Sequence, residues 1–190
     1  WFGLADNGRI HFGESSSSVF YSDNNSYNND GNWYYLTVVK NGSTINFYSN
    51  GINSGLRSSS VAQINDNSEK LLLGAKNNAD NSGMSSDLYD GKIGRFEIWN
   101  RALSISEIQF YMSSLPNGNE SGLVGLWNFS EGSGGTLTDL SGNGNDGTIN
   151  GANWSADAPL QYANNCTATD DVVVTVNPQD DATFAYSSSS

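Results

Sequence analysis

The sequence predicts an all-β protein, a β-sandwich with one short helix and a short β tail. Its 21 glycines and its clusters of Asn, Ser and Asp separate short apolar runs, and turns this frequent are typical of all-β architecture. The segment 31–51, GNWYYLTVVKNGSTINFYSNG, places two runs rich in β-branched and aromatic residues around Asn41-Gly42, and Asn50-Gly51 follows the second run. Because Asn-Gly adopts positive φ easily, we expect a β-hairpin with a type I′ turn over residues 40–43.

The first strand of this hairpin, from Trp33 to Val39, carries apolar side chains on both of its alternating faces. A strand without a polar face is covered on both sides, so we expect it to be central in a sandwich. Other short apolar runs predict further strands, and polar runs between them predict loops. The expected strands are 1–4, 10–12, 19–21, 71–74 and 93–99, and the expected loops are 22–32, 55–60 and 76–90.

A helix is predicted after residue 104, where Ser-Ile-Ser-Glu forms a capping box. The Ser104 hydroxyl accepts from the Glu107 amide, and the Glu107 carboxylate accepts from the Ser104 amide. The helix should therefore run from about Ile105 to Met112, with Ile105, Ile108 and Met112 on one face.

Charge limits the classes of partner. The chain has 20 acidic and 8 basic side chains, a formal net charge of -12. Such an acidic surface repels nucleic acid and anionic lipid, and it suits divalent cations and neutral glycans, although solubility alone also accounts for it. No apolar run approaches the roughly 20 residues that span a bilayer. The absence of an initiator Met and of a signal peptide leads us to expect a piece of a larger parent chain with adjacent domains.

Catalytic signals are weak. His11 is the single histidine, and no Gly-x-Ser-x-Gly elbow accompanies it, so a Ser-His-Asp triad is not indicated. Glu97 is the lone acid of the strand 93–99, and no carboxylate pair of the glycosidase kind is evident. We therefore expect a protein that is not an enzyme. Cys166 is the single cysteine, which excludes an intrachain disulfide and a Cys-based zinc site.

Three segments carry a family resemblance: WYYLTVVKNGSTINFYSNG, LLLGA and GKIGRFEIWNRALSISEI. In this order they resemble the second half of a laminin G-like domain of the concanavalin A-like superfamily, over roughly residues 1–112. The resemblance implies a concanavalin A-like jelly roll. The family commonly has acidic residues where this chain has Gly94 and Arg95, so any role of those acids is in doubt here.

Residues 122–154 resemble the opening of the same kind of domain, although they follow the helix. They either begin a second sandwich or supply a closing strand, from Leu123 to Phe129, to the first, and we favour the closing strand. This variant resembles large surface proteins (adhesins) of gliding bacteria exported by the type IX system, which implies a secreted or cell-surface location. We expect one domain over residues 1–160 that lacks its N-terminal part, then a linker and the edge of an immunoglobulin-like repeat over 161–190. Cys166 then either pairs outside the chain or is a small buried hydrophobe.

One loop is a candidate calcium site. In DLSGNGND, from Asp139 to Asp146, oxygen-bearing side chains alternate as at the start of a calcium loop, with Asp139, Ser141, Asn143 and the Asn145 carbonyl as ligands. Position twelve is Asn150 and not a bidentate Glu. The same spacing also forms ordinary turns through side chain to backbone hydrogen bonds, so both readings stay open.

Two loops combine tyrosine with amides and carboxylates, the mixture that stacks on sugar rings and binds their hydroxyls. The alternative is that the tyrosines pack on the rim and the asparagines are only solvated. The candidate ligand-binding residues are Tyr21, Asn24, Asn25, Tyr27, Asp87 and Tyr89. With the resemblance, they favour a carbohydrate-binding or adhesion module of a bacterial surface protein. The alternatives are a spacer domain without a ligand and, less favoured, a glycosidase-like enzyme.

Overall fold

The computed structural model describes residues 2–5, 7–15, 18–60, 71–77 and 84–159. Cys166 and the expected β tail lie outside these residues. Thirteen elements are present in the described part of the chain. They are β1 (Phe2–Ala5), β2 (Arg9–Ser15), β3 (Ser18–Tyr21), β4 (Leu36–Asn41), β5 (Thr44–Ser49), β6 (Ile52–Ser58), β7 (Ala75–Asn77), β8 (Met84–Leu88), β9 (Phe96–Trp99), α1 (Ile105–Ser113), β10 (Leu123–Trp127), β11 (Thr136–Leu137) and β12 (Gly147–Thr148).

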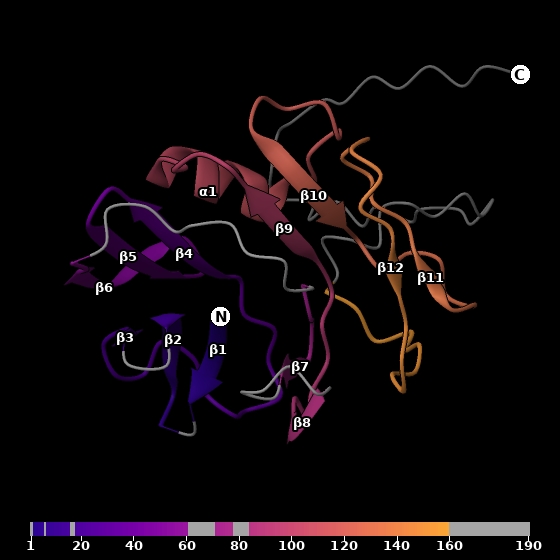
Figure 1. The fold of residues 1–190 in the computed structure, drawn as a ribbon, viewed down its shortest axis with the longest axis horizontal. Coiled ribbons are helices and arrows are strands. Elements are labelled where there is room, and N and C mark those ends of the chain that lie inside the picture. The colour runs from indigo at the N-terminus through magenta and orange to yellow at the C-terminus, as the bar shows by residue number, and fades with distance from the viewer. Residues whose placement is uncertain (1, 6, 16–17, 61–70, 78–83, 160–190) are drawn as a thin grey trace, which may run out of the picture.

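The strands β1 to β6 and the helix α1 form three layers (Figure 1). The middle layer is the antiparallel sheet β4-β5-β6, with α1 on one side and the antiparallel sheet β1-β2-β3 on the other. This arrangement explains why both faces of the 33–39 run are apolar. One face meets the helix and the other meets the second sheet.

Two hydrophobic clusters correspond to these two interfaces. Between the middle sheet and the helix, the buried residues are Val39, Tyr48, Leu103, Ile108 and Tyr111. Between the two sheets, Ile10, Ile45 and Phe47 are fully buried, and Phe12, Phe20, Leu36 and Val38 pack against them. Burial of one such side chain stabilises the fold by roughly 1.5–3 kcal/mol.

The predicted hairpin is confirmed, but its turn differs by one residue from the expectation. Asn41 pairs with Thr44, so the two loop residues are Gly42 and Ser43. Of these only Gly42 has positive φ, at 55°, as the first position of a type II′ turn requires. The turn with two positive φ angles is the next one, where Asn50 (49°) and Gly51 (71°) join β5 to β6.

Three expectations for strands were wrong. β5, and not the 33–39 strand, is the middle strand of its sheet among the described strands. The expected loop 55–60 contains most of β6, which pairs with β5 along its length. The apolar run 71–74 is not a strand, since the strand β7 begins only at Ala75. Leu71 and Leu73 are exposed.

The helix begins where the capping box predicts. The Glu107 amide donates to the Ser104 hydroxyl, and the Ser104 amide donates to the Glu107 carboxylate. Ile108 and Tyr111 are the buried residues of α1, whereas Ile105 is exposed. The predicted face was therefore partly wrong. Tyr111, and not the neighbouring Met112, is the buried residue of the last turn.

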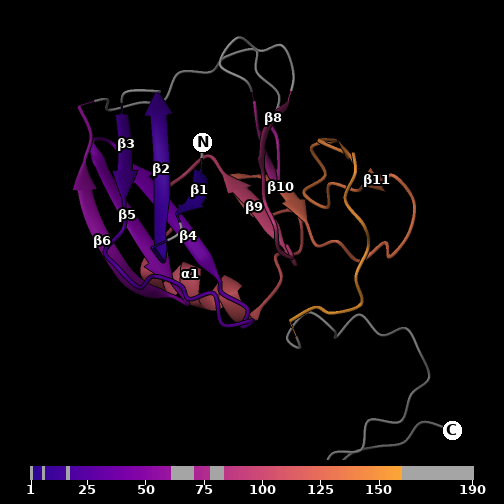
Figure 2. The ribbon, with the colours of Figure 1, turned by 90° about the horizontal axis from the view of Figure 1, so that it is seen from below.

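β10 lies beside β9 and pairs with it antiparallel, and Figure 2 shows the two strands next to each other. Trp127 is buried and its ring stacks on Phe96 with 5.8 Å between ring centroids. The segment 123–129 thus provides a strand through its first five residues. The described strands form five separate hydrogen-bonded sheets, so closure into one sandwich stays a prediction. No helix in the described residues is long and apolar enough to cross a membrane.

Candidate functional site

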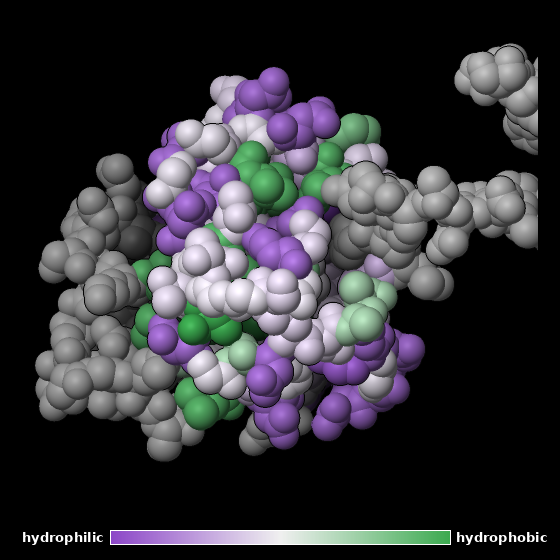
Figure 3. Space-filling view, turned by 90° about the vertical axis from the view of Figure 1, so that its right-hand side faces the viewer, coloured by the Kyte–Doolittle hydropathy of each residue, from purple (hydrophilic) through white to green (hydrophobic). Residues whose placement is uncertain are grey.

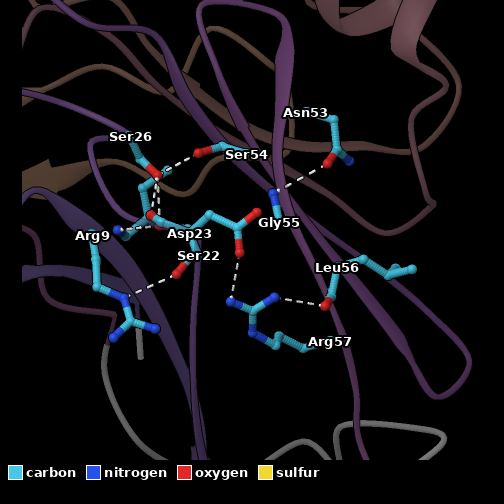
Figure 4. Close-up of polar contacts among 10 residues, drawn as sticks. Arg9, Ser22, Asp23, Ser26, Asn53, Ser54, Gly55, Leu56 and Arg57 are labelled. Atoms are coloured by element: carbon cyan, nitrogen blue, oxygen red, sulfur yellow. Dashed lines mark hydrogen bonds and ion pairs between the residues drawn. The ribbon is translucent and has the colours of Figure 1, made fainter.

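The loop that follows β3 begins with a buried polar cluster (Figure 4). Ser22 and Ser26 are both buried, and their hydroxyl oxygens lie 2.6 Å apart. The Ile10 amide donates to the Ser22 hydroxyl oxygen at 2.8 Å, which ties the loop to β2. The Ser26 hydroxyl contacts that of Ser54 in β6 and donates to the main-chain oxygen of Asp23. Because buried hydroxyls that are fully bonded fix local geometry, this cluster holds the start of the loop rigid.

A glycine lets the loop approach β6 closely. The Asp23 amide donates to the Ser54 carbonyl at 2.6 Å, beside Gly55. A Cβ atom on Gly55 would lie 2.9 Å from the Asp23 nitrogen, and its φ of 144° also favours glycine. Next to this contact, Arg57 forms an ion pair with the Asp23 carboxylate at 2.9 Å. The loop is therefore attached to both sheets.

Three predicted ligand residues lie at this attached end of the loop. Tyr21, the last residue of β3, is 38% exposed. Asn24 and Asn25 are exposed, and Asn25 has the positive φ of 61° that asparagine tolerates in turns. An accessible ring and two accessible asparagines thus lie within five residues of one another in the chain, next to the bonded Ser22 and Ser26.

Tyr27 is placed differently. Its hydroxyl donates to the main-chain oxygen of Ala5 in β1, and its ring meets Tyr34 edge-on at 6.4 Å between centroids. The side chain is half-buried. These contacts of Tyr27 agree with the alternative expectation, in which the tyrosines pack on the rim of the sandwich.

Tyr34 is a member of this loop surface that the sequence analysis assigned only to the strand. Its hydroxyl donates to the Asp30 carboxylate at 2.9 Å and accepts from the Asn28 amide at 3.4 Å. The amide of Asn32 and the Tyr34 hydroxyl donate to Asp30 and lower the pKa of its carboxyl. The Asp-x-x-x-Tyr spacing from Asp30 to Tyr34 was the available signal, but strand periodicity obscured it.

In the second predicted loop, the residues that the structure describes are mostly strand. Asp87 lies in β8, and its side chain is outside what the structure describes. Tyr89 directly follows this strand and is 45% exposed, with its main-chain amide donating to the Gly74 carbonyl at 2.8 Å. Tyr89 is therefore accessible on a different β-hairpin, β7-β8.

The candidate calcium loop is organised around the buried carboxylate of Asp139. One carboxylate oxygen accepts from the Leu126 and Ser141 amides at 3.0 and 2.9 Å. The other oxygen accepts from the Ser141 hydroxyl and the Asn145 amide, both at 2.9 Å. Burial raises the pKa of the Asp139 carboxyl, but these donors outweigh it and the pKa lies below its usual range.

The other predicted calcium ligands also face protein groups. The side-chain amide nitrogens of Asn143 and Asn145 donate to the Val124 carbonyl at 3.1 and 2.9 Å. The Asn145 main-chain oxygen accepts from the Trp127 indole at 3.1 Å. Hydrogen-bond donors therefore surround the Asp139 carboxylate, whereas a cation needs several oxygens that point toward it. The loop as described does not fit calcium. It fits the turn alternative, and calcium binding stays a prediction that solution measurements decide.

Glu97 is not available for acid catalysis in this arrangement. Its carboxylate lies 2.7 Å from the Arg95 Nε atom, and both side chains are almost fully buried, at 7% and 3% exposure. The Trp99 indole donates to the second oxygen at 3.0 Å, and the Arg95 guanidinium lies over the Tyr35 ring at 5.0 Å. Burial nevertheless raises the pKa of Glu97. Arg95, where the family commonly has an acid, is thus a buried structural partner that the sequence analysis did not identify.

Comparisons with known proteins agree with this fold. Residues 1–109 match the model of a family described as the concanavalin A-like lectin/glucanases superfamily. A crystal structure of a proposed carbohydrate-binding protein from Bacteroides ovatus is similar with a TM-score of 0.63 and 15% sequence identity, over 78% of this chain and 44% of that chain. An S-layer domain-containing protein from Clostridium thermocellum gives a TM-score of 0.40 and 23% identity, over 55% of this chain and 50% of that chain. This chain therefore spans half or less of each of those structures. No curated protein sequence matches it.

Proposed function

Since the chain belongs to the concanavalin A-like lectin/glucanase superfamily through residues 1–109, we propose that it is a non-catalytic carbohydrate-binding module. The observation that carries the proposal is the accessible Tyr21 ring at the end of β3, followed three and four residues later in the chain by the exposed Asn24 and Asn25. A tyrosine ring stacks on the C–H face of a sugar, and side-chain amides bind its hydroxyls. The Bacteroides ovatus protein, which is described as carbohydrate-binding, supports the class of ligand.

Rigidity of the loop base supports the same proposal. The loop is fixed by the buried Ser22 and Ser26 hydroxyls, so binding a sugar there orders few groups. A binding surface that is already ordered loses less conformational entropy on binding. The pairing of Glu97 with Arg95 supports recognition over hydrolysis, because this buried acid is neither free nor accessible.

A secreted or cell-surface location in a bacterium forms part of the proposal, including an adhesin of the gliding kind exported by the type IX system. The resemblance of residues 122–154 to such proteins motivates it. A glycan and adjacent domains of the parent chain are the proposed partners.

A glycan array probed with purified protein tests the function. We expect binding to a restricted set of saccharides, and Tyr21→Ala should weaken it by about 10-fold or more, which matches the loss of ring stacking. Phe110→Ala, at an exposed aromatic ring on α1, is the matched control and should leave affinity unchanged. Absence of binding to every saccharide would favour the spacer alternative.

A further inference from the structure

The outer face of the β1-β2-β3 sheet carries three side chains that point away from the core. Ile10 in β2 and Phe20 in β3 belong to the cluster between the two sheets. Because side chains alternate along a strand, Arg9, His11 and Tyr21 lie on the opposite face. His11 is the cross-strand partner of Tyr21, and the two rings meet edge-on with 5.8 Å between centroids. Figure 2 views the molecule from this side, with β2 and β3 in front of the middle sheet.

Arg9 is held in one orientation on this face. Its Nε atom donates to the main-chain oxygen of Ser22 at 3.0 Å. Its guanidinium carbon lies 4.9 Å from the centroid of the Tyr21 ring, a cation–π contact. In Figure 4 both terminal nitrogens of Arg9 extend away from the polar cluster without a bond to the residues drawn.

Arg9 also differs from the other arginines in the described residues, since it has no carboxylate partner there. Unlike the buried Ser22 and Ser26, Arg9 is only half-buried. The other three arginines each form an ion pair with a carboxylate. These pairs are Arg57 with Asp23, Arg95 with Glu97, and Arg101 with Glu107.

The geometry points to an acidic saccharide as the ligand of this face, an inference that rests on the proposed carbohydrate-binding function. The planar fork of the Arg9 guanidinium matches the two oxygens of a carboxylate or sulfate group. The adjacent Tyr21 ring offers a surface for the sugar to which that acidic group is attached. Arg9 is already fixed by Ser22 and Tyr21, so it loses little rotamer freedom when an anion binds.

The net charge of -12 does not oppose this ligand at short range. At physiological ionic strength the Debye length is about 8 Å, so acids far from the face are screened. The acid nearest in the chain with a described side chain, Asp23, is neutralised by Arg57. Among the described side chains this face is therefore locally cationic, and a short oligosaccharide with few charges suits it better than a long polyanion.

Isothermal calorimetry with matched oligosaccharides tests the inference. The carboxylate probe is trigalacturonic acid, and its methyl ester is the neutral control with the same backbone. A sulfated galactose oligosaccharide distinguishes sulfate from carboxylate as the source of the acidic group. We expect one acidic probe to bind at least about 10-fold more tightly than the methyl ester, as loss of a charge-assisted hydrogen bond predicts. Its affinity should also fall as salt is added.

Variants locate the site. Arg9→Gln should remove the preference for the acidic probe, and Arg9→Lys should restore only part of it because lysine lacks the planar fork. Arg101→Gln is the matched control, because Arg101 is paired with Glu107 of α1, on the other side of the middle sheet. Melting curves show whether each variant folds. If Arg9→Gln does not fold, the salt dependence of the affinity of the unmutated protein for the acidic probe remains as the test.

Each outcome is decisive. Equal binding of the acid and its ester, without an effect of Arg9→Gln, overturns the inference and leaves carbohydrate binding in place. An acid preference that persists in Arg9→Gln also overturns it. Absence of binding to these probes and to every saccharide of the array overturns the proposed function and the inference together.

Discussion

The carboxylate of Asp139 accepts a hydrogen bond from the main-chain amide of Leu126, 13 residues earlier, at 3.0 Å. The contact joins the 139–146 loop to β10, and Trp127 reinforces it by donating to the Asn145 carbonyl. An Asp139→Ala variant should lose roughly 2–4 kcal/mol of unfolding free energy, because it leaves several buried donors without an acceptor. Urea denaturation measures the loss.

The same variant separates the two readings of the loop. Asp157→Ala is the control, since Asp157 is exposed, forms a surface ion pair with Lys92 and should change stability little. If the loop is a turn alone, melting temperatures of the unmutated protein in calcium and in chelator are equal. A rise in calcium that disappears in Asp139→Ala would establish the ion, because a ligand that binds the native state stabilises it.

The second prediction concerns the buried pair of Arg95 and Glu97. Arg95→Met should cost about 3–5 kcal/mol of unfolding free energy, since it leaves a buried carboxylate without its partner. The double variant Arg95→Met/Glu97→Leu should recover most of this loss. Equal stability of the single and double variants in urea denaturation would contradict the assignment of a coupled pair.

Glu97 also predicts a pH effect with a defined sign. Burial raises its pKa in the folded state, so the folded protein binds a proton more tightly than the unfolded chain does. Its contribution to stability is full below the unfolded pKa and is lost as the pH rises through the folded pKa. The stability of Glu97→Gln relative to the unmutated protein should therefore increase as the pH rises above about 4.5.

The third prediction concerns the helix cap and has the opposite sign. Hydrogen bonds from the Ser104 amide and hydroxyl, with Arg101, lower the pKa of Glu107 from 4.5 to about 2. Its stabilising effect is present above the unfolded pKa and is lost as the pH falls towards about 2. Glu107→Gln should be less stable than the unmutated protein at neutral pH, with a difference that shrinks in acid. Ser106→Ala, at an exposed position of the helix, is the control. Its difference in stability from the unmutated protein should not change over the pH range in which Glu107 titrates.

The fourth prediction tests the close contact of the loop with β6. Gly55→Ala should destabilise the protein by roughly 1–3 kcal/mol, because the added Cβ meets the Asp23 nitrogen in a backbone region that L residues rarely adopt. Gly135→Ala is the matched control, since nothing lies within 4 Å of the added Cβ there. Thermal melts of the two variants that coincide would show that the contact is not tight.

Local interactions explain what could be predicted from the sequence. The capping box involves Ser104 and Glu107 alone, so it was recognisable without knowledge of the tertiary structure. The hairpin strands were evident from two runs of β-branched and aromatic residues around Asn41-Gly42, but the turn was displaced by one residue. Its register follows from cross-strand pairs such as Val38 with Phe47, which are set by packing against the other sheet.

The candidate site shows where such reasoning ends. Alternating oxygens from Asp139 to Asn145 suit an ion and a turn equally, and contacts with distant groups of β10, such as the Leu126 amide and the Trp127 indole, favour the turn. Arg9 could not be singled out from the sequence. It is distinguished by having no carboxylate partner among the described residues, and the fold decides which acids lie next to which arginines. Tyr21 was identified because it stands at the boundary between a strand and a polar loop.

The pairing of β9 with β10 has a consequence for where this module ends. Family similarity stops at residue 109, inside α1, while the strand that covers Phe96 begins at Leu123. A fragment cut at the limit of similarity would divide the helix and leave the hydrogen-bonding edge of β9 open to another chain. The segment that sequence comparison recognises is thus shorter than the segment that buries its own surfaces. A fragment prepared for study should therefore include β10 as well.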